Sequence, residues 1–258
     1  MTVLCSADCH LMEPPNLWAE RLPTAMRDRA MRYEYTDTHR IWWQEGAPFM
    51  HEPLGIEGRE DGTPITDDID LRLKELDQDG IWAEMIFGNM GTLILNITDP
   101  AFAIESARVY NDYLAEAYGP HGERELPVAI VPVVDLDDAV AEIERVAALG
   151  LRSIGLPMSP PSPYFLEDYD RVWSAAEAAG LPVAFHVGTG TGAFGAGMAE
   201  AMAAAMATAR GQETNATTLG IHLAQPPQLL VGTLVGSGTL ARHPGLQALV
   251  VEAGAGWL

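Results

Sequence analysis

Cysteine is nearly absent from this chain. Its 258 residues include only two cysteines, Cys5 and Cys9, and both lie close to the start. On an extended segment, where each residue advances the chain by about 3.3 Å, their Cα atoms lie too far apart for a disulfide. A chain without disulfides fits a reducing compartment, so we predict a cytoplasmic protein.

Basic residues are also scarce. The chain has 15 Lys and Arg against 36 Asp and Glu, which gives a formal net charge of −21. Such a surface repels nucleic-acid phosphates and anionic membranes, although a high charge also serves solubility. We therefore expect a small-molecule substrate and neither a nucleic-acid nor a membrane partner.

Long apolar runs are missing as well. The longest, Leu229–Leu240, is interrupted by Gly232, Gly236 and Gly238 and falls short of the roughly 20 residues that a membrane span needs. No charged segment followed by an apolar run opens the chain, so we also expect no signal peptide.

The sequence does contain six short apolar segments that we interpret as buried strands. Their residues are apolar almost throughout rather than in alternation, as expected for strands covered on both faces. The segments are Thr2–Ala7, Ile81–Phe87, Pro127–Val134, Ser153–Pro157, Pro182–Val187 and Leu246–Val251. Three of them follow a helical pattern that ends at Gly80, Gly150 or Gly180. This order of helix, glycine and strand is typical of βα units in a parallel sheet.

The βα order predicts an α/β fold of the (β/α)8 TIM-barrel type. One such barrel takes roughly 250 residues, and 48% of this chain is hydrophobic. A closed barrel has eight strands, so six strands indicate either an open sheet or an incomplete barrel without its last strands. Residues 14–66 are rich in Pro, Trp and Tyr and lack a clear period. We interpret them as a cap inserted after the first strand of a single domain, 1–258.

Side chains that can bind a metal stand at the ends of the predicted strands. Asp8 and His10 follow the first strand, His186 ends the fifth and Glu252 ends the sixth. The carboxyl ends of barrel strands meet at one rim, where such folds place their active sites. Two imidazoles and a carboxylate suit one Zn²⁺ ion, with Mn²⁺ as the alternative. An Asp-x-His pair is common by chance and a lone strand histidine is usually a core residue, so the shared position at strand ends carries this prediction.

The remaining histidines are weaker candidates. His222 lies beyond a glycine-rich segment, and we consider it either a catalytic acid or base or a surface residue. The others are expected in loops or turns; they are His39, His51, His121 and His243.

A second motif suggests a different chemistry. Gly190–Gly195 matches the pattern G-x-G-x-x-G after a predicted strand, which would indicate an NAD(P)-binding oxidoreductase. That fingerprint belongs in the first βα unit of a dinucleotide-binding domain, whereas here it follows the fifth strand. We keep this interpretation as an alternative to the metal site.

Several motifs together resemble the amidohydrolase-related family. Within it, the chain is similar to the branch that includes aminocarboxymuconate-semialdehyde decarboxylase and γ-resorcylate decarboxylase. The motifs that carry the resemblance are Ser6–His10, Glu13–Pro15, Leu76–Ile81, Asn111–Leu114, Pro182–Gly188, His243–Leu246 and Glu252–Trp257.

The resemblance implies a (β/α)8 barrel with one divalent metal. By position, Asp8 and His10 match the family's first-strand ligands, and His186 matches its fifth-strand ligand. The family's last ligand is an aspartate after the eighth strand, beyond the end of this chain, and we therefore expect a C-terminally truncated barrel. In the decarboxylases the sixth strand usually ends in a catalytic histidine, and Glu252 stands there in this chain.

Three functional hypotheses follow. In a carboxy-lyase, the metal would bind the carboxylate of a small organic acid and stabilise negative charge as CO2 leaves. In a hydrolase, a metal-bound water would attack a lactone, ester or amide, with Glu252 as general base. The third hypothesis is a fragment without catalytic activity. An incomplete barrel exposes unpaired strand edges, and such edges favour association. A homodimer is one possible assembly.

Overall fold

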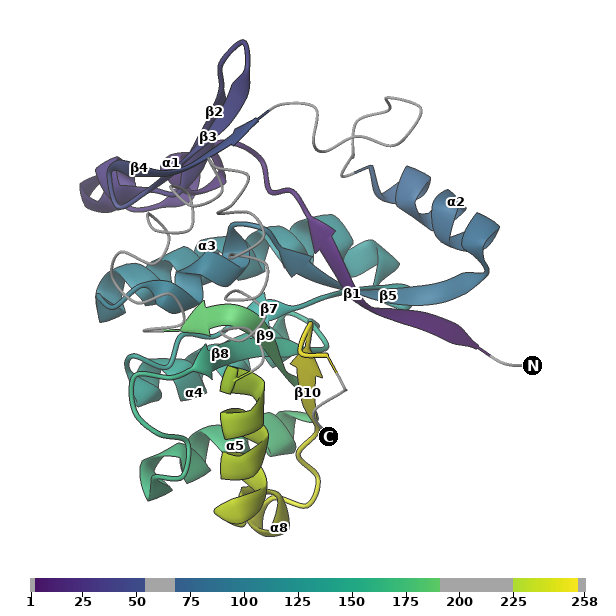
Figure 1. Cartoon of the computed structure of the whole chain (residues 1–258), viewed down its shortest axis with the longest axis vertical. Helices are drawn as coiled ribbons and strands as arrows, with labels where there is room; N and C mark the ends of the chain where they lie inside the picture. Colours follow the sequence, from purple (N-terminus) through teal and green to yellow (C-terminus); the bar gives the residue numbers. More distant parts are fainter. Residues whose placement is uncertain (1–2, 54–67, 191–224, 255–258) are drawn as a thin grey trace, which may run out of the picture.

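The computed structural model describes residues 3–53, 68–190 and 225–254 (Figure 1). Its central feature is a set of parallel strands in two sheets. β1 (Leu4–Leu11), β5 (Ile81–Gly88) and β6 (Glu125–Pro127) form the first sheet. β7 (Ala129–Ile130), β8 (Ile154–Ser159), β9 (Val183–Gly190) and β10 (Ala248–Val251) form the second.

The two sheets are joined through one continuous stretch of chain. Within it, the amide of Val128 donates to the carbonyl of Ile86 in the first sheet, at 2.9 Å. The next amide, of Ala129, donates to the carbonyl of Ser153 beside the second sheet, at 3.1 Å. β6 and β7 are therefore two segments of one strand, and the spatial order of the parallel strands follows their order in the chain, as in a TIM barrel. All six predicted strands are confirmed among the described residues.

Helices lie between the strands, and three of them end at or just before the predicted glycines, Gly80, Gly150 and Gly180. The helices are α2 (Ile69–Asp79), α3 (Pro100–Tyr118), α4 (Leu136–Ala148), α5 (Asp170–Ala179) and α8 (Thr239–Arg242), with a further helical stretch at 225–236. The side chain of Asp99 accepts a hydrogen bond from the amide of Phe102 and caps α3. Gly80 and Gly180 end α2 and α5 with φ of 71° and 65°, the left-handed conformation that a glycine adopts without strain.

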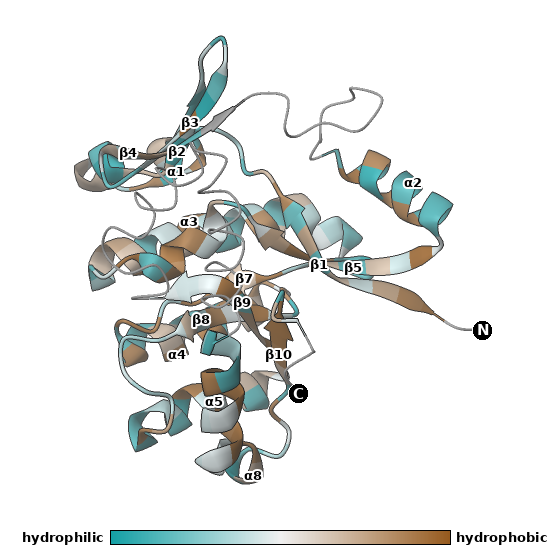
Figure 2. Cartoon of the chain, in the orientation of Figure 1, coloured by the Kyte–Doolittle hydropathy of each residue, from teal (hydrophilic) through white to brown (hydrophobic). Residues whose placement is uncertain are grey.

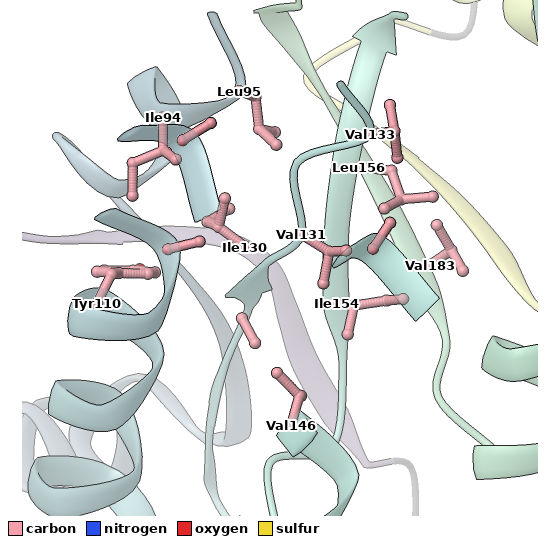
Figure 3. Packing of buried hydrophobic residues seen from close by; sticks show 14 of the residues in the cluster. Ile94, Leu95, Tyr110, Ile130, Val131, Val133, Val146, Ile154, Leu156 and Val183 are labelled. Carbon is pink, nitrogen blue, oxygen red and sulfur yellow. The ribbon is translucent and has the colours of Figure 1, made fainter. Parts of the chain in front are cut away.

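Apolar residues fill two layers on opposite faces of the strands. The larger layer lies between strands and helices, and Figure 3 shows Val146 of α4 there beside Ile154 of β8 and Val131, which follows β7. Figure 2 shows the helices striped with hydrophilic and hydrophobic residues, as this one-sided burial requires. The smaller layer contains Phe87, Val128, Ala184 and Val251, with Met85 and Leu249 packed against it. Because side chains alternate along a strand, these residues mark the inner face, and His186 shares that face with Ala184.

The predicted cap region contains helices and strands that its sequence does not predict. α1 (Leu17–Arg21) and the 3-10 helix η1 (Thr24–Arg29) precede an antiparallel sheet of β2 (Arg32–Tyr35), β3 (His39–Gln44) and β4 (Ala47–Pro53). Trp18 of α1 is fully buried, and its indole nitrogen donates to the carbonyl of Ser106 in α3 at 2.9 Å. The region is thus fixed to the barrel helices through this side chain; its last residues lie outside the described part.

Shorter 3-10 helices complete the described fold. They are η2 (Gly91–Asn96), η3 (Gly119–His121) and η4 (Glu167–Tyr169). In the described ranges, no helix is long and apolar enough to span a lipid bilayer.

Candidate metal centre

The three predicted metal ligands lie together at one end of the parallel strands. One potential donor atom from each of Asp8, His10 and His186 lies within 4.8 Å of the others. Oδ1 of Asp8 is 3.7 Å from Nε2 of His10 and 3.7 Å from Nε2 of His186. The two imidazoles meet edge to face, with 5.2 Å between ring centroids. Strands that are distant in sequence therefore present their donors to one point.

The position of β1 differs from the prediction in one respect. The apolar run stops at Ala7, but the strand continues to Leu11, so Asp8 and His10 lie within it rather than after it. His10 pairs with Phe87 of β5 in the parallel register. The strand continues because its backbone hydrogen bonds to β5 do not depend on apolar side chains.

The hydrogen bonds of His186 leave one ring nitrogen free to bind a metal. Its Nδ1 lies 2.9 Å from the carbonyl oxygen of Val187, and a carbonyl only accepts, so Nδ1 carries the proton. Nε2 is buried and has no hydrogen-bond partner among the described residues. A buried nitrogen without a partner is costly, and a bound ion is one explanation for such an atom. The donor set therefore fits a divalent cation.

His10 is also suited to be a ligand, because it favours the neutral form. Burial lowers the pKa of His10 below its usual value of 6.5, and the neighbouring His186 lowers it further. A neutral imidazole is the form that binds a metal. Its main chain is held by Arg72 of α2, whose Nη1 donates to the His10 carbonyl at 3.0 Å.

Solvent reaches this cluster from one side. The side chains of Asp8 and His10 are 35% and 39% exposed, whereas that of His186 is 11% exposed. Phe87, itself buried, lies against both imidazoles, with ring centroids 6.2 Å from His10 and 5.0 Å from His186. The two rings thus have an apolar wall on one side and access for a substrate on the other.

Glu252 lies beside the cluster at the end of β10. Its Oε2 is 3.7 Å from Nε2 of His186, and its side chain is 56% exposed. Its backbone has φ of 57°, in the left-handed region that non-glycine residues rarely adopt. Strained residues of this kind concentrate at functional sites, where surrounding structure holds them in place.

The remaining sequence predictions concern His222, the glycine motif and the other histidines. His222 and residues 191–195 of the glycine motif lie outside the described residues. His39 and His51 were expected in loops, and that prediction is wrong: they lie in β3 and β4. The cap sequence shows no alternation strong enough to reveal these strands.

The first glycine of the motif is described, and its amide is already engaged. Gly190 ends the fifth parallel strand, β9, and its amide donates to Oδ1 of Asn96 at 2.7 Å. This amide is therefore not free to bind a phosphate. His243, expected in a loop or turn, is buried between the carboxylates of Asp170 and Glu177, at 3.6 and 3.5 Å.

The structural role of Glu13 is not predicted by the sequence. Glu13, just beyond β1, is fully buried. Its carboxylate accepts hydrogen bonds from the amides of Met90 and Gly91, the latter at 2.6 Å. It thereby fixes the start of η2 after β5. The sequence shows a glutamate before two prolines, and no local pattern marks such a residue as buried.

Comparison with protein-family profiles matches residues 7–258 to the family described as Amidohydrolase. The chain belongs to this family. It therefore has the TIM-type barrel fold of that family, to which the described residues contribute six strands. A search of the curated proteins finds no match.

Solved structures show the same fold. An amidohydrolase from Mycobacterium avium subsp. paratuberculosis superposes with a TM-score of 0.73 at 18% identity, over 98% of this chain and 72% of that one. The 5-carboxyvanillate decarboxylase of Sphingomonas paucimobilis gives 0.59 at 20% identity, over 96% of this chain and 67% of that one.

A third structure holds a metal. It is a dihydroxybenzoic acid decarboxylase from Polaromonas with bound manganese and 2-nitroresorcinol; its TM-score is 0.55 at 20% identity, over 97% of this chain and 65% of that one. The chain thus spans between 65% and 72% of the length of these three structures.

Proposed function

We propose that this chain is part of a metal-dependent hydrolase that acts on an ester, lactone or amide of a small organic acid. Asp8, His10 and His186 would hold one divalent cation, Zn²⁺ in the first place and Mn²⁺ as the alternative. One observation carries this proposal: Nε2 of His186, buried and without a hydrogen-bond partner among the described residues, lies 3.7 Å from Oδ1 of Asp8 and next to the His10 imidazole.

A divalent cation at this position supplies a Lewis acid, which lowers the pKa of a bound water and polarises a carbonyl. The residues of the chain contribute the remaining chemistry. Asp8 supplies negative charge, and the neutral imidazoles supply nitrogen donors without adding charge. Glu252 accepts a proton from the attacking water at its carboxylate and returns it to the leaving oxygen or nitrogen.

Glu252 is the reason to place hydrolysis first. A carboxylate beside the donors suits a general base for water, whereas the decarboxylases of the resemblance usually have a histidine at this position. The resemblance to decarboxylases favours carboxy-lyase activity as the second candidate. In that case Glu252 would deliver a proton to the carbon that CO2 leaves.

The experiment uses the 258-residue chain, stripped of metal and reloaded with Zn²⁺ or Mn²⁺. A panel of small lactones and esters is followed by pH-stat titration, and a panel of aromatic acids by CO2 trapping. Metal-dependent ester or lactone turnover without CO2 release supports the hydrolase. CO2 release from an acid, with no hydrolysis, replaces it with the carboxy-lyase.

Binding is measured separately from turnover. Isothermal titration with Zn²⁺ and Mn²⁺ is expected to show one site per chain. Stoichiometric binding with no turnover on either panel would identify a fragment without activity of its own. Failure of the wild-type chain to bind either ion would overturn the proposed metal centre itself.

A further inference from the structure

The strand that carries His186 is irregular at its end. Pro157 of β8 pairs with His186, and the next pair joins Ser159 with Gly190. Two steps along β8 therefore correspond to four along β9, which makes a bulge of Val187, Gly188 and Thr189. Gly188 and Gly190 have φ of 76° and 103°, conformations that favour glycine.

Thr189 closes this bulge with two hydrogen bonds. Its hydroxyl donates to the carbonyl oxygen of His186 at 2.6 Å and accepts from the amide of Met158 at 3.0 Å. Thr189 is 3% exposed, so water does not compete for either bond. The bulge takes the Met158 amide out of the regular ladder, and the hydroxyl supplies the acceptor that the ladder no longer provides.

The same bulge determines which nitrogen of His186 faces the other donors. The carbonyl that accepts from His186 Nδ1, at 2.9 Å, belongs to Val187, the first residue of the bulge. With Nδ1 protonated and bound there, Nε2 keeps its lone pair and faces Asp8. The ring orientation therefore depends on the path of the backbone between His186 and Gly190.

We propose that Thr189 is a positioning residue of the metal centre, which holds the His186 imidazole with Nε2 as its ligand nitrogen by closing the bulge. This inference rests on the proposed function, because it assigns Thr189 a part in the same site. Thr189 does not touch the reacting atoms; it acts through the backbone of His186.

A second set of contacts holds the bulge from the opposite side. The amide of Gly190 donates to Oδ1 of Asn96, the last residue of η2, at 2.7 Å. At the start of η2, the amide of Gly91 donates to the carboxylate of Glu13. Glu13 follows β1, the strand that carries Asp8 and His10. Gly190 itself has no room for a side chain, because a Cβ would lie 2.0 Å from the carbonyl oxygen of Ser159. The bulge is thus tied to β8 through Thr189 and to the β1 side through η2.

The test compares Thr189→Val, Thr189→Ser and Ser153→Ala with the wild-type chain. Valine keeps the shape of threonine and removes both hydrogen bonds, whereas serine keeps the hydroxyl. Ser153 is the matched control: its buried hydroxyl donates to the carbonyl of Pro127 at 3.3 Å, beside the opposite end of β8. Two quantities are measured: the affinity for Zn²⁺ by competition with a chromogenic chelator, and the tautomer of His186 by ¹⁵N NMR of the metal-free chain.

We expect Thr189→Val to weaken Zn²⁺ binding by about 10- to 100-fold, the usual cost of losing a group that orients a ligand. Its His186 is expected to lose the pure Nδ1–H tautomer. Thr189→Ser and Ser153→Ala should keep both the wild-type affinity and the wild-type tautomer. A merely structural loss would lower stability in both Thr189→Val and Ser153→Ala without changing the tautomer.

Wild-type affinity and an unchanged tautomer in Thr189→Val would overturn the inference. If Thr189→Val does not fold, Asn96→Ala releases the bulge from the other side, with the same expected changes and the same contrary result. Failure of the proposed function looks different: the wild-type chain then binds no metal. In that case the tautomer of the metal-free chain still decides whether Thr189 orients His186.

Discussion

At the scale of single residues, His186 and His243 show how two buried histidines can differ in role. His186 has one nitrogen bound to a backbone carbonyl and the other buried beside Asp8 and His10. Nε2 of His243 is also buried without a hydrogen-bond partner among the described residues. The His243 ring, however, lies between two carboxylates of α5, at 3.6 and 3.5 Å, and in the described part of the chain it belongs to no group of three possible metal ligands. The sequence places a histidine at each position and does not distinguish these surroundings.

Replacement of His186 should therefore act on metal binding, and replacement of His243 on stability. We expect His186→Ala to lower Zn²⁺ affinity by at least about 100-fold, because the loss of a ligand exceeds the loss of a group that orients one. His243→Gln should leave the affinity unchanged while it lowers the thermal midpoint. Isothermal titration and thermal melts of both variants test this, and equal affinities for the two would count against His186 as a ligand.

Glu252 combines a functional position with an unfavourable backbone conformation. Glu252→Gln keeps the shape and removes the base, so we expect hydrolysis to fall by about 10²- to 10⁴-fold. Glu252→Gly relieves the strain at φ of 57°, so it should raise the free energy of unfolding by about 1 kcal/mol while abolishing activity. Chemical denaturation and initial rates measure the two effects. Full hydrolytic activity in Glu252→Gln would remove this residue from the mechanism.

At the scale of elements, α2 is joined to the first sheet by one cation and two carboxylates. Arg72 donates to Oε1 of Glu84 at 2.7 Å, and its Nε lies 3.9 Å from Oε2 of Glu125. Glu84 and Glu125 are buried and directly opposite each other on β5 and β6. Burial, together with the neighbouring Glu84, raises the pKa of Glu125 to about 8.

This contact makes stability depend on pH. The unfolded chain releases the Glu125 proton near pH 4.5, whereas the folded chain keeps it up to about pH 8. Between these values the folded state binds more protons, so the free energy of unfolding should decrease as pH rises and level off above about 8. Glu125→Gln, which stays neutral, should flatten this dependence in urea denaturation between pH 5 and 9.

An exposed pair provides the control for that experiment. Glu116 forms an ion pair with Arg21, and its side chain is 61% exposed. Glu116→Gln should leave the pH dependence of wild type unchanged, because an exposed pair contributes little to stability. If Glu125→Gln retains the full slope, the pH dependence arises elsewhere in the chain.

The elements also differ in how well their sequences predict them. The strands before and after α4 and α5 were predictable, because buried parallel strands are apolar throughout and Gly150 and Gly180 mark where helices end. The end of β1 and the strands β2 to β4 were not. Asp8 and His10 interrupt the apolar run of β1. β2 has only four residues, and β3 and β4 show no regular alternation of polar and apolar residues.

At the scale of the whole molecule, the metal centre joins the first strand of the described order, β1, to the fifth, β9. Asp8 and His10 lie on β1, and His186 lies on β9 in the other sheet. A ligand that binds only the folded state stabilises it, so Zn²⁺ at about 100 times its Kd should add about 2.7 kcal/mol to the free energy of unfolding.

This effect is measured by thermal melts with added Zn²⁺ and with chelator. The thermal midpoint of wild type should rise with metal and fall on chelation, whereas that of His186→Ala should respond to neither. A rise of equal size in His186→Ala would place the stabilising ion at some other site.

The amino-acid sequence alone determined the order of helices and parallel strands and the residue types available for a metal site. These features depend on near neighbours: burial sets the apolar runs, and the backbone conformation at a helix end selects glycine. Only the tertiary structure decided that Asp8, His10 and His186 share one point, that Nε2 of His186 is unpartnered there, and that Thr189 closes the bulge behind it. Each of these depends on the pairing of strands far apart in the chain, which no local pattern encodes.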